Sequence, residues 1–299
     1  MTKKLLDILS APKALLWGWN LFLIFSGICL LWLTFRGGEG LPLGGIWRFA
    51  AIAGIAFLAE YIDSALGMGY GTTLTPILII FGYKAIEAVV PAILVSEFVT
   101  GISAGFFHHR VGNVDLRRGT RAYTSTWILS ICSVLGGCGS VLLALKLSKN
   151  VVSWYIGLMV ISIGLFILLA KRYMGRFSWG KIIGLGTVAA FNKGISGGGY
   201  GPLLTGGQVL IGVPEKNAIA VTSLAEGVMC LAGIITYGLF QKGTFAWSLI
   251  FPLVTGAILS VPLAAWTVKI LPEQNMRKTI GYATVFLGAL LIVKLYVGA

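Results

Sequence analysis

Long apolar segments separated by short polar loops recur along the whole chain. Each is close to the twenty or so residues that a helix needs to cross a bilayer, whereas two further apolar pieces, 72–82 and 202–212, are about half as long. The pattern predicts an all-α polytopic membrane protein with about nine full spans plus two half-helices. The predicted spans are 14–35, 46–66, 86–107, 122–145, 151–170, 180–196, 217–238, 245–268 and 278–297.

The composition agrees with a membrane location. Of the 299 residues, 57% are hydrophobic and only 11% are charged, against about 25% charged in soluble chains. A soluble globule and a disordered chain are therefore both excluded. The net charge of +13 does not indicate nucleic acid, because the basic residues lie in loops rather than along one stripe. The lipid bilayer is the expected surrounding.

An internal repeat divides the chain. Shifting the sequence by 130 residues aligns Gly67–Thr75 with Gly197–Thr205, with six of nine positions identical. With a slip of one residue, Glu97 aligns with Glu226. The order of long span, glycine cluster, half-helix and three long spans occurs twice. We therefore predict an N-terminal extension with the first span (1–45), a first repeat (46–175) and a second repeat (176–299).

The distribution of Lys and Arg predicts the orientation. If each half-helix completes a crossing, the loops on one side hold fifteen basic residues and those on the other side hold six. The richer side, with the N-terminus, should face the cytoplasm. Five crossings per repeat would give inverted-topology repeats, each with a broken helix, as in many secondary transporters. If the half-helices dip and return, the repeats would instead be parallel.

The two glycine clusters are the first candidate site. A chain interrupts a helix inside a membrane only where it lines protein or a watery cavity, and glycine lets a ligand approach the backbone amides. A half-helix starting there directs free N–H groups and a positive dipole end toward an anion. Tight helix packing is the alternative explanation. The candidate substrate-binding residues of the clusters are Gly69, Tyr70, Gly71, Thr72, Gly198, Gly199, Tyr200 and Gly201.

Charged residues inside apolar segments are the second clue. Such residues are costly in a bilayer and are usually functional. Lys193 and Asp63 occupy equivalent repeat positions, which predicts Lys193 as a ligand of an anionic substrate and Asp63 as its counter-charge. A structural ion pair between the repeats is the alternative. Glu97 and Glu226 are candidates for carrying a coupling proton or for structural hydrogen bonding, and Glu60 is a weaker candidate.

Several polar side chains extend these candidates. Tyr70 and Tyr200 carry hydroxyls that could donate to an oxyanion or serve packing alone. Gln208 adds a donor to the second half, next to Thr222 and Ser223.

The adjacent histidines His108 and His109 close a long span on the predicted cytoplasmic side. Neighbouring positions on one helix cannot both face one metal. We expect these rings to interact with the helix C-terminus and the lipid headgroups.

Enzyme signatures are missing from the sequence. It contains neither HExxH nor GxxxxGK[ST], the motifs of a metalloprotease and of an ATP-driven pump. We therefore expect no catalytic residue, no metal site and no cofactor.

The glycine clusters resemble those of the TauE/SafE sulfite exporter family, also called the toluenesulfonate uptake permease family. The resemblance covers about 46–297. It implies a secondary transporter of sulfite, sulfonates or related organosulfur anions in the inner membrane. The chain differs from the common pattern by Asp63, Lys193 and Glu226 and by a tyrosine in both clusters. The matching motifs are Gly67-Met68-Gly69-Tyr70-Gly71 with Pro76, Gly197-Gly198-Gly199-Tyr200-Gly201-Pro202, Thr222-Ser223-Leu224 and His109-Arg110-Val111-Gly112-Asn113-Val114-Asp115.

Together these features predict a multi-pass carrier of a small anion that works by alternating access, with protons as the candidate coupling ion. A cation or metal-ion carrier that uses the intramembrane carboxylates is the main alternative, and a non-transporting scaffold is a third. The sequence does not specify the anion, the direction of transport or the oligomeric state.

Overall fold

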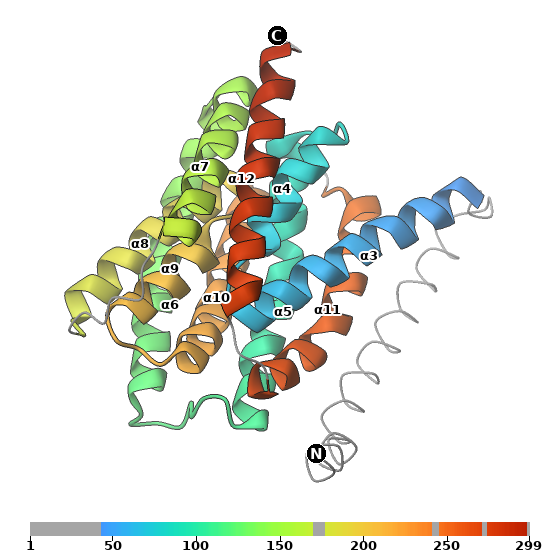
Figure 1. Ribbon diagram of the computed structural model, residues 1–299. Helices are drawn as coiled ribbons and strands as arrows, with labels where there is room; N and C mark the ends of the chain where they lie inside the picture. Colours follow the sequence, from blue (N-terminus) through green and yellow to red (C-terminus); the bar gives the residue numbers. More distant parts are fainter. Residues whose placement is uncertain (1–42, 170–176, 241–244, 271–273, 298–299) are drawn as a thin grey trace.

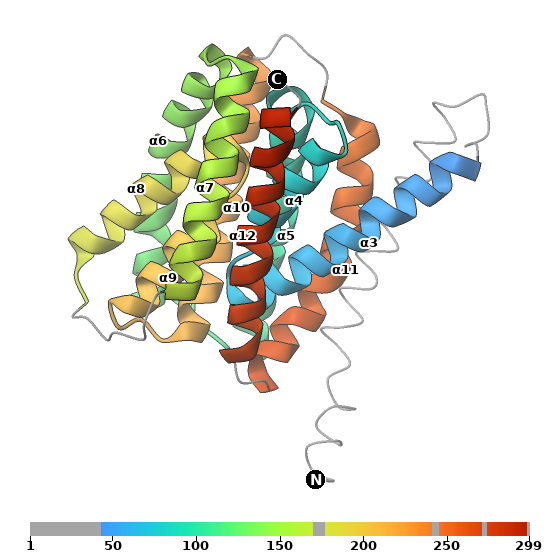
Figure 2. The same ribbon diagram turned by 45° about the horizontal axis from the view of Figure 1, so that its top comes forward.

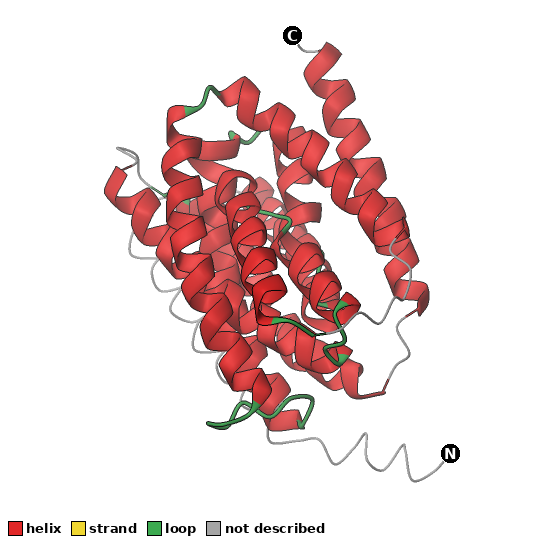
Figure 3. Cartoon of the chain, turned by 90° about the vertical axis from the view of Figure 1, so that its left-hand side faces the viewer, coloured by secondary structure: helices red, strands yellow, loops and turns green. Residues whose placement is uncertain are grey.

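The computed structural model describes residues 43–169, 177–240, 245–270 and 274–297, and these residues form helices joined by short loops, without a strand (Figure 3). The predicted first span, 14–35, and the N-terminal lysines lie outside the described residues. The elements are α3 (Leu43–Leu66), α4 (Tyr70–Ile80), the π-helix η1 (Ala85–Val89), α5 (Val90–Val111), α6 (Arg121–Lys146), α7 (Lys149–Leu169), α8 (Trp179–Ser196), α9 (Tyr200–Leu210), α10 (Glu215–Phe240), α11 (Trp247–Ile270) and α12 (Gln274–Val297).

Six helical stretches of the described residues are long and apolar enough to cross a membrane. Large apolar side chains such as Trp127, Leu135 and Leu239 are exposed on the outside of the helix bundle, where lipid rather than water would cover them. The chain is therefore a multi-pass membrane protein. The count of nine spans stays a prediction. The six stretches are Gly45–Leu66, Ala85–Val111, Arg121–Lys146, Lys149–Phe166, Glu215–Phe240 and Trp247–Val268.

Both predicted helix interruptions are present. α3 ends before Gly67 and α4 begins after Gly69, whose φ angles are 68° and 136°. α8 ends before Gly197 and α9 begins after Gly199, with φ angles of 71° and 83°. These backbone angles strain any residue with a side chain, so glycine is required. We call Gly67–Gly69 the first break and Gly197–Gly199 the second break.

Each short helix folds back along the helix before it. Arg48, near the start of α3, donates a hydrogen bond of 2.7 Å from Nη2 to the hydroxyl of Tyr83, just after α4. Likewise Leu185, early in α8, touches Gly207, late in α9. The two helices of each pair are thus antiparallel, and the pairs open toward opposite sides of Figure 1. We call α3–α4 the first hairpin and α8–α9 the second hairpin; their tips are the two breaks.

The two predicted repeats pack against each other through matching helices. α3 packs on α11 and α8 packs on α6, while α5 pairs with α10 and α7 with α12. The long contact of α7 with α12 is visible in both Figure 1 and Figure 2. Gly101 of α5 faces α10 so closely that an added Cβ would lie 2.6 Å from the carbonyl oxygen of Ser223. Part of the glycine excess therefore serves close helix packing rather than helix interruption.

Candidate functional site

The two breaks face each other inside the protein. A Cβ added to Gly198 would lie 2.7 Å from the carbonyl carbon of Gly71, and one added to Gly201 would lie 2.9 Å from the Cα of Met68. The hydroxyl of Thr205 donates a hydrogen bond of 2.9 Å to the carbonyl of Gly67. The predicted residues Gly71, Gly198 and Gly201 are therefore brought together, and any larger residue there would collide with backbone.

Gly69 and Gly199 have a different role from the other predicted glycines. A Cβ on Gly69 would point at Ile62 of its own hairpin, and one on Gly199 would approach Ile163 and Met159 of α7. These two glycines turn the chain at each break and do not face the opposite break. Thr72 donates a hydrogen bond of 3.2 Å to the carbonyl of Gly69, which closes the first break.

The two tyrosines lie fully buried at the starts of the short helices. Tyr70 shares a hydrogen bond of 2.6 Å with Ser96, and Tyr200 shares one of 2.7 Å with Ser133. Both hydroxyls therefore already have a serine partner, as expected if the tyrosines serve packing. Neither serine was singled out by the sequence, because serines inside apolar spans are common.

Lys193 lies at the centre of a buried charged cluster. Its ammonium forms ion pairs with Glu97 of α5 and with Glu226 of α10, the latter at 2.8 Å. Lys193 is 1% exposed, and the two glutamates are nearly as buried. A charge this buried is stable only with such partners. Lys193 thus connects α8 with one helix from each predicted repeat.

Asp63 makes a contact that the sequence did not predict, and its role as a counter-charge of Lys193 stays a prediction. Its Oδ1 accepts a hydrogen bond of 3.2 Å from the backbone N–H of Tyr70, at the start of α4. The ammonium of Lys193 extends to Glu97 and Glu226. Asp63 therefore neutralises the positive end of the short helix behind its own break.

Glu60 completes a set of four buried carboxylates. Its two oxygens accept hydrogen bonds from Ser64, at 2.6 Å, and from Thr100, at 3.0 Å. Two of the four acids pair with Lys193, Glu60 accepts from two hydroxyls, and Asp63 accepts from a backbone amide. The described residues contain no group of three or more acids, histidines or cysteines suited to a metal ion.

Gln208 is fully buried on α9, on the second hairpin. Its amide donates a hydrogen bond of 2.9 Å to the hydroxyl of Thr222, while its carbonyl oxygen has no hydrogen-bond partner. Thr75 has an unpartnered buried hydroxyl as well. Thr75 and Thr205 occupy equivalent positions of the predicted repeats, but neither was predicted from the sequence to belong to the site.

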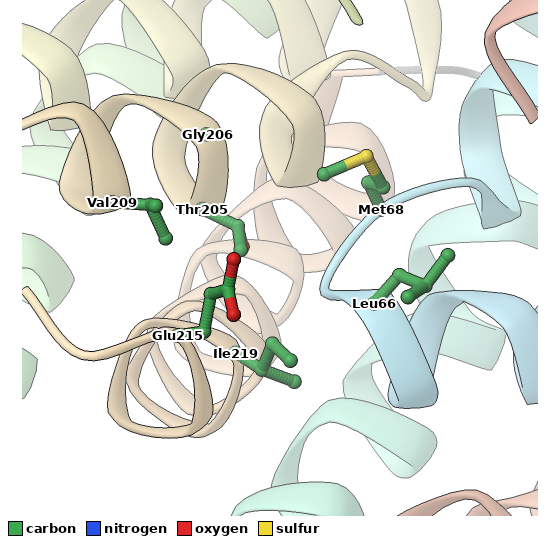
Figure 4. A pocket seen from close by; sticks show the side chains of 7 residues that line it. All are labelled: Leu66, Met68, Thr205, Gly206, Val209, Glu215 and Ile219. Carbon is green, nitrogen blue, oxygen red and sulfur yellow. The ribbon is translucent and has the colours of Figure 1, made fainter. Parts of the chain in front are cut away.

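A small cavity borders the first break and the second hairpin. Figure 4 shows the carboxylate of Glu215 directed toward Thr205, opposite Met68 of the first break and Leu66 at the end of α3. Glu215 was not predicted from the sequence, because it lies just outside an apolar span, where charges are common. The cavity therefore lies next to the place where the two breaks meet. Its lining residues are Leu66, Met68, Thr205, Gly206, Val209, Glu215 and Ile219.

The histidines contradict the expectation of a headgroup role for His108. Its side chain is fully buried, and its Nε2–H faces the carbonyl of Ser64 at 2.9 Å. The amide of Asn113 donates to His108 Nδ1 at 3.0 Å and to the carbonyl of Ala265 at 2.8 Å. His108 and Asn113 thus join α5 to α3 and α11. His109 is half-buried and accepts from the N–H of Leu116 at 3.3 Å.

The sequence model of the family described as "Sulfite exporter TauE/SafE" matches residues 52–291, which include both breaks. The chain belongs to this family. The match confirms the resemblance found at the glycine clusters. A family of membrane transporters is also consistent with a chain that is not an enzyme.

A relative from Bacillus subtilis (strain 168), named "Probable membrane transporter protein YtnM", is 26% identical over 249 residues. The alignment covers 78% of this chain and 79% of the relative. No solved structure matches the chain significantly.

Proposed function

We propose that this TauE/SafE family member is a secondary carrier of a small oxyanion, sulfite or an organosulfonate, and that it works by alternating access. The observation that carries the proposal is the meeting of two interrupted helices inside the protein, beside a buried lysine. Interrupted helices with inward N-termini form the anion sites of several transporter folds. The family name supports sulfite as the first substrate to test.

The repeats are proposed to be inverted. This is supported by the exchange of packing partners, in which α3 contacts α11 while the equivalent α8 contacts α6. It is also supported by the two hairpins, which open in opposite directions (Figure 1). Each repeat would then contain one re-entrant hairpin and three crossing helices. The long helix before each break, which the sequence expectation counted as a crossing, would enter the membrane and return through its short helix. Three is an odd number, so the second repeat would begin on the opposite side of the membrane.

The predicted ligands remain those of the two breaks and of the second hairpin. The amides at the starts of α4 and α9 would bind the anion, with the charge of Lys193 and the side chain of Gln208 contributing. The two tyrosines would contribute only if they exchanged their serine partners for the substrate.

Proton coupling follows from the charges around Lys193. Its ammonium already contacts two carboxylates, and a third negative charge in a buried site would be strongly repelled. Protonation of Glu97 or Glu226 would free the ammonium for the anion. We therefore propose that each anion moves together with a proton.

The test uses the full chain in proteoliposomes, with labelled sulfite as the substrate. We expect the wild type to take up sulfite and Lys193→Met to lose at least about 90% of the rate, because it removes the buried ammonium beside the breaks. Lys84→Met, at a lysine whose side chain is 67% exposed, is the matched control and should leave transport unchanged. Uptake of a divalent cation with no uptake of sulfite would contradict the proposal.

Proton movement is measured separately with methanesulfonate, since this strong acid carries no proton of its own at neutral pH. A pH dye inside the vesicles should report acidification during its uptake. An inward proton gradient should accelerate uptake by the wild type but not by a Glu97→Gln, Glu226→Gln double variant. An unchanged response to the gradient in this variant would remove the two glutamates from the coupling.

A further inference from the structure

The two breaks are similar in sequence but differ in how their polar groups are satisfied. The shift of 130 residues pairs Asp63 with Lys193 and Thr75 with Thr205. The first pair differs in charge. The second pair is identical in residue type but differs in its hydrogen bonds.

At the first break the polar groups already have partners. Asp63 accepts the hydrogen bond of the Tyr70 N–H at the start of α4, and Thr205 donates to the carbonyl of Gly67. At the opposite end of α4, the ammonium of Lys294 donates to the carbonyl of Ile79 at 3.1 Å and to that of Ile80 at 2.6 Å. A carboxylate thus lies at the positive end of α4 and an ammonium at its negative end.

At the second break the N–H of Gly198 donates to the hydroxyl of Ser196 at 3.1 Å. Lys193 stands where the first break has Asp63, and an ammonium cannot accept a hydrogen bond from the amides at the start of α9. The hydroxyl of Thr75 is 1% exposed and has no hydrogen-bond partner. It lies 3.3 Å from the position of a Cβ added to Gly197. A buried hydroxyl without a partner is costly unless something else binds it.

We propose that the anion binds at the second break alone, at the start of α9, and that the Thr75 hydroxyl is one of its donors. The first break already holds the Asp63 carboxylate as an internal anion. This inference rests on the proposed function and narrows it from a site shared by two breaks to a site at one of them. The ligand is a small oxyanion with at least two oxygens, one for the α9 amides and one for the hydroxyl.

Electrostatic repulsion also favours binding of the anion at the second break rather than at the first. An anion at the first break would compete with the Asp63 carboxylate for the same N–H groups, and the two negative charges would repel at short distance in a buried site. Four positions before Gly197 the chain carries Lys193 instead, whose ammonium pairs with Glu97 and Glu226. When one of these glutamates is protonated, as proposed for the coupling, the second break attracts an anion, whereas the Asp63 carboxylate repels one from the first break.

The experiment measures sulfite binding to the purified full chain by calorimetry, with Thr75→Val and Thr205→Val as matched variants. Loss of one hydrogen bond to a charged ligand should raise the Kd of Thr75→Val about tenfold or more. Thr205→Val should change the Kd less than about threefold and mainly lower the melting temperature, because its hydroxyl binds protein backbone. Thr75→Ser keeps the hydroxyl and should bind like the wild type.

Equal Kd changes in the two valine variants, or a larger change for Thr205→Val, would overturn the inference while leaving the carrier proposal intact. If the wild type binds neither sulfite nor methanesulfonate, the carrier proposal and this inference both fall. If Thr75→Val does not fold, Thr75→Ala takes its place. Binding by that variant within about threefold of Thr75→Ser would then overturn the inference.

Discussion

The first and second hairpins have nearly the same backbone plan but opposite charges behind their breaks. Each consists of a long helix, a glycine turn and an eleven-residue helix that returns. Behind the first break stands Asp63, whose carboxylate caps the short helix. Behind the second stands Lys193, which extends to two glutamates. Two similar hairpins can therefore keep the same backbone plan while the residue at one equivalent position changes from a carboxylate to an ammonium and takes different partners.

The largest expected effect is at the second hairpin. Lys193→Met leaves Glu97 and Glu226 buried without their cation, and such a loss costs about 3–5 kcal/mol. We expect a strongly lowered melting temperature in detergent. Adding Glu97→Gln and Glu226→Gln to this variant should restore a substantial part of the lost melting temperature, because no unpaired charge then stays buried. A variant with wild-type stability would show that the charged cluster does not connect the two repeats.

A second change should affect both hairpins alike. Gly71→Ala and Gly201→Ala each place a Cβ against the backbone of the opposite break, and overpacking of this kind costs about 1–3 kcal/mol. Gly54→Ala, in α3 with nothing within 4 Å of the added Cβ, is the control and should be neutral or stabilising. Thermal unfolding measures all three. If only one of the two break variants lost stability, the reciprocal contact of the tips would be contradicted.

Substitution of the two tyrosines tests whether the hydroxyls of the two hairpins have the same role. Tyr70→Phe and Tyr200→Phe each remove one buried hydrogen bond to a serine, with an expected loss of about 1–2 kcal/mol. If the tyrosines serve packing, both variants should keep sulfite affinity within about threefold. A selective loss of affinity in Tyr200→Phe would instead add this hydroxyl to the substrate ligands.

The smallest effect is expected at the first hairpin. In Asp63→Asn the side-chain oxygen can still accept from the Tyr70 N–H, so only the charge at the start of α4 is lost, about 0.3–1 kcal/mol. Sulfite affinity should stay equal or improve, because a negative charge is removed from the neighbourhood of the breaks. Calorimetry measures it. A loss of binding as large as that of Lys193→Met would mean that the two breaks are equivalent after all.

Much of the architecture was predictable because a bilayer makes hydrophobicity and helix interruption easy to read. Apolar runs predicted the long helices, and the paired glycine clusters predicted the interruptions at Tyr70 and Tyr200. Glu97, Glu226 and Lys193 were singled out because intramembrane charges are rare. Their mutual pairing was not predicted, since alignment of the repeats shows equivalent positions but not the direction of a long side chain.

The errors have similar causes. His108 follows the end of an apolar run, so it was expected among headgroups, whereas the loop carrying Asn113 folds back and buries it. Ser96 and Ser133 were overlooked because only their distance from the tyrosine hydroxyls gives them a role.

The sequence by itself determined that the chain spans a membrane, that its two glycine clusters are similar and where its helices break, because these properties depend on local composition and backbone freedom. Only the tertiary structure decided that the breaks meet, that Lys193 pairs with Glu97 and Glu226, and that the Thr75 hydroxyl lacks the partner that Thr205 has. Pairing between distant helices depends on packing geometry, which the sequence of one segment does not contain. Residues of the same type at equivalent repeat positions can therefore acquire different partners when their neighbours differ in charge.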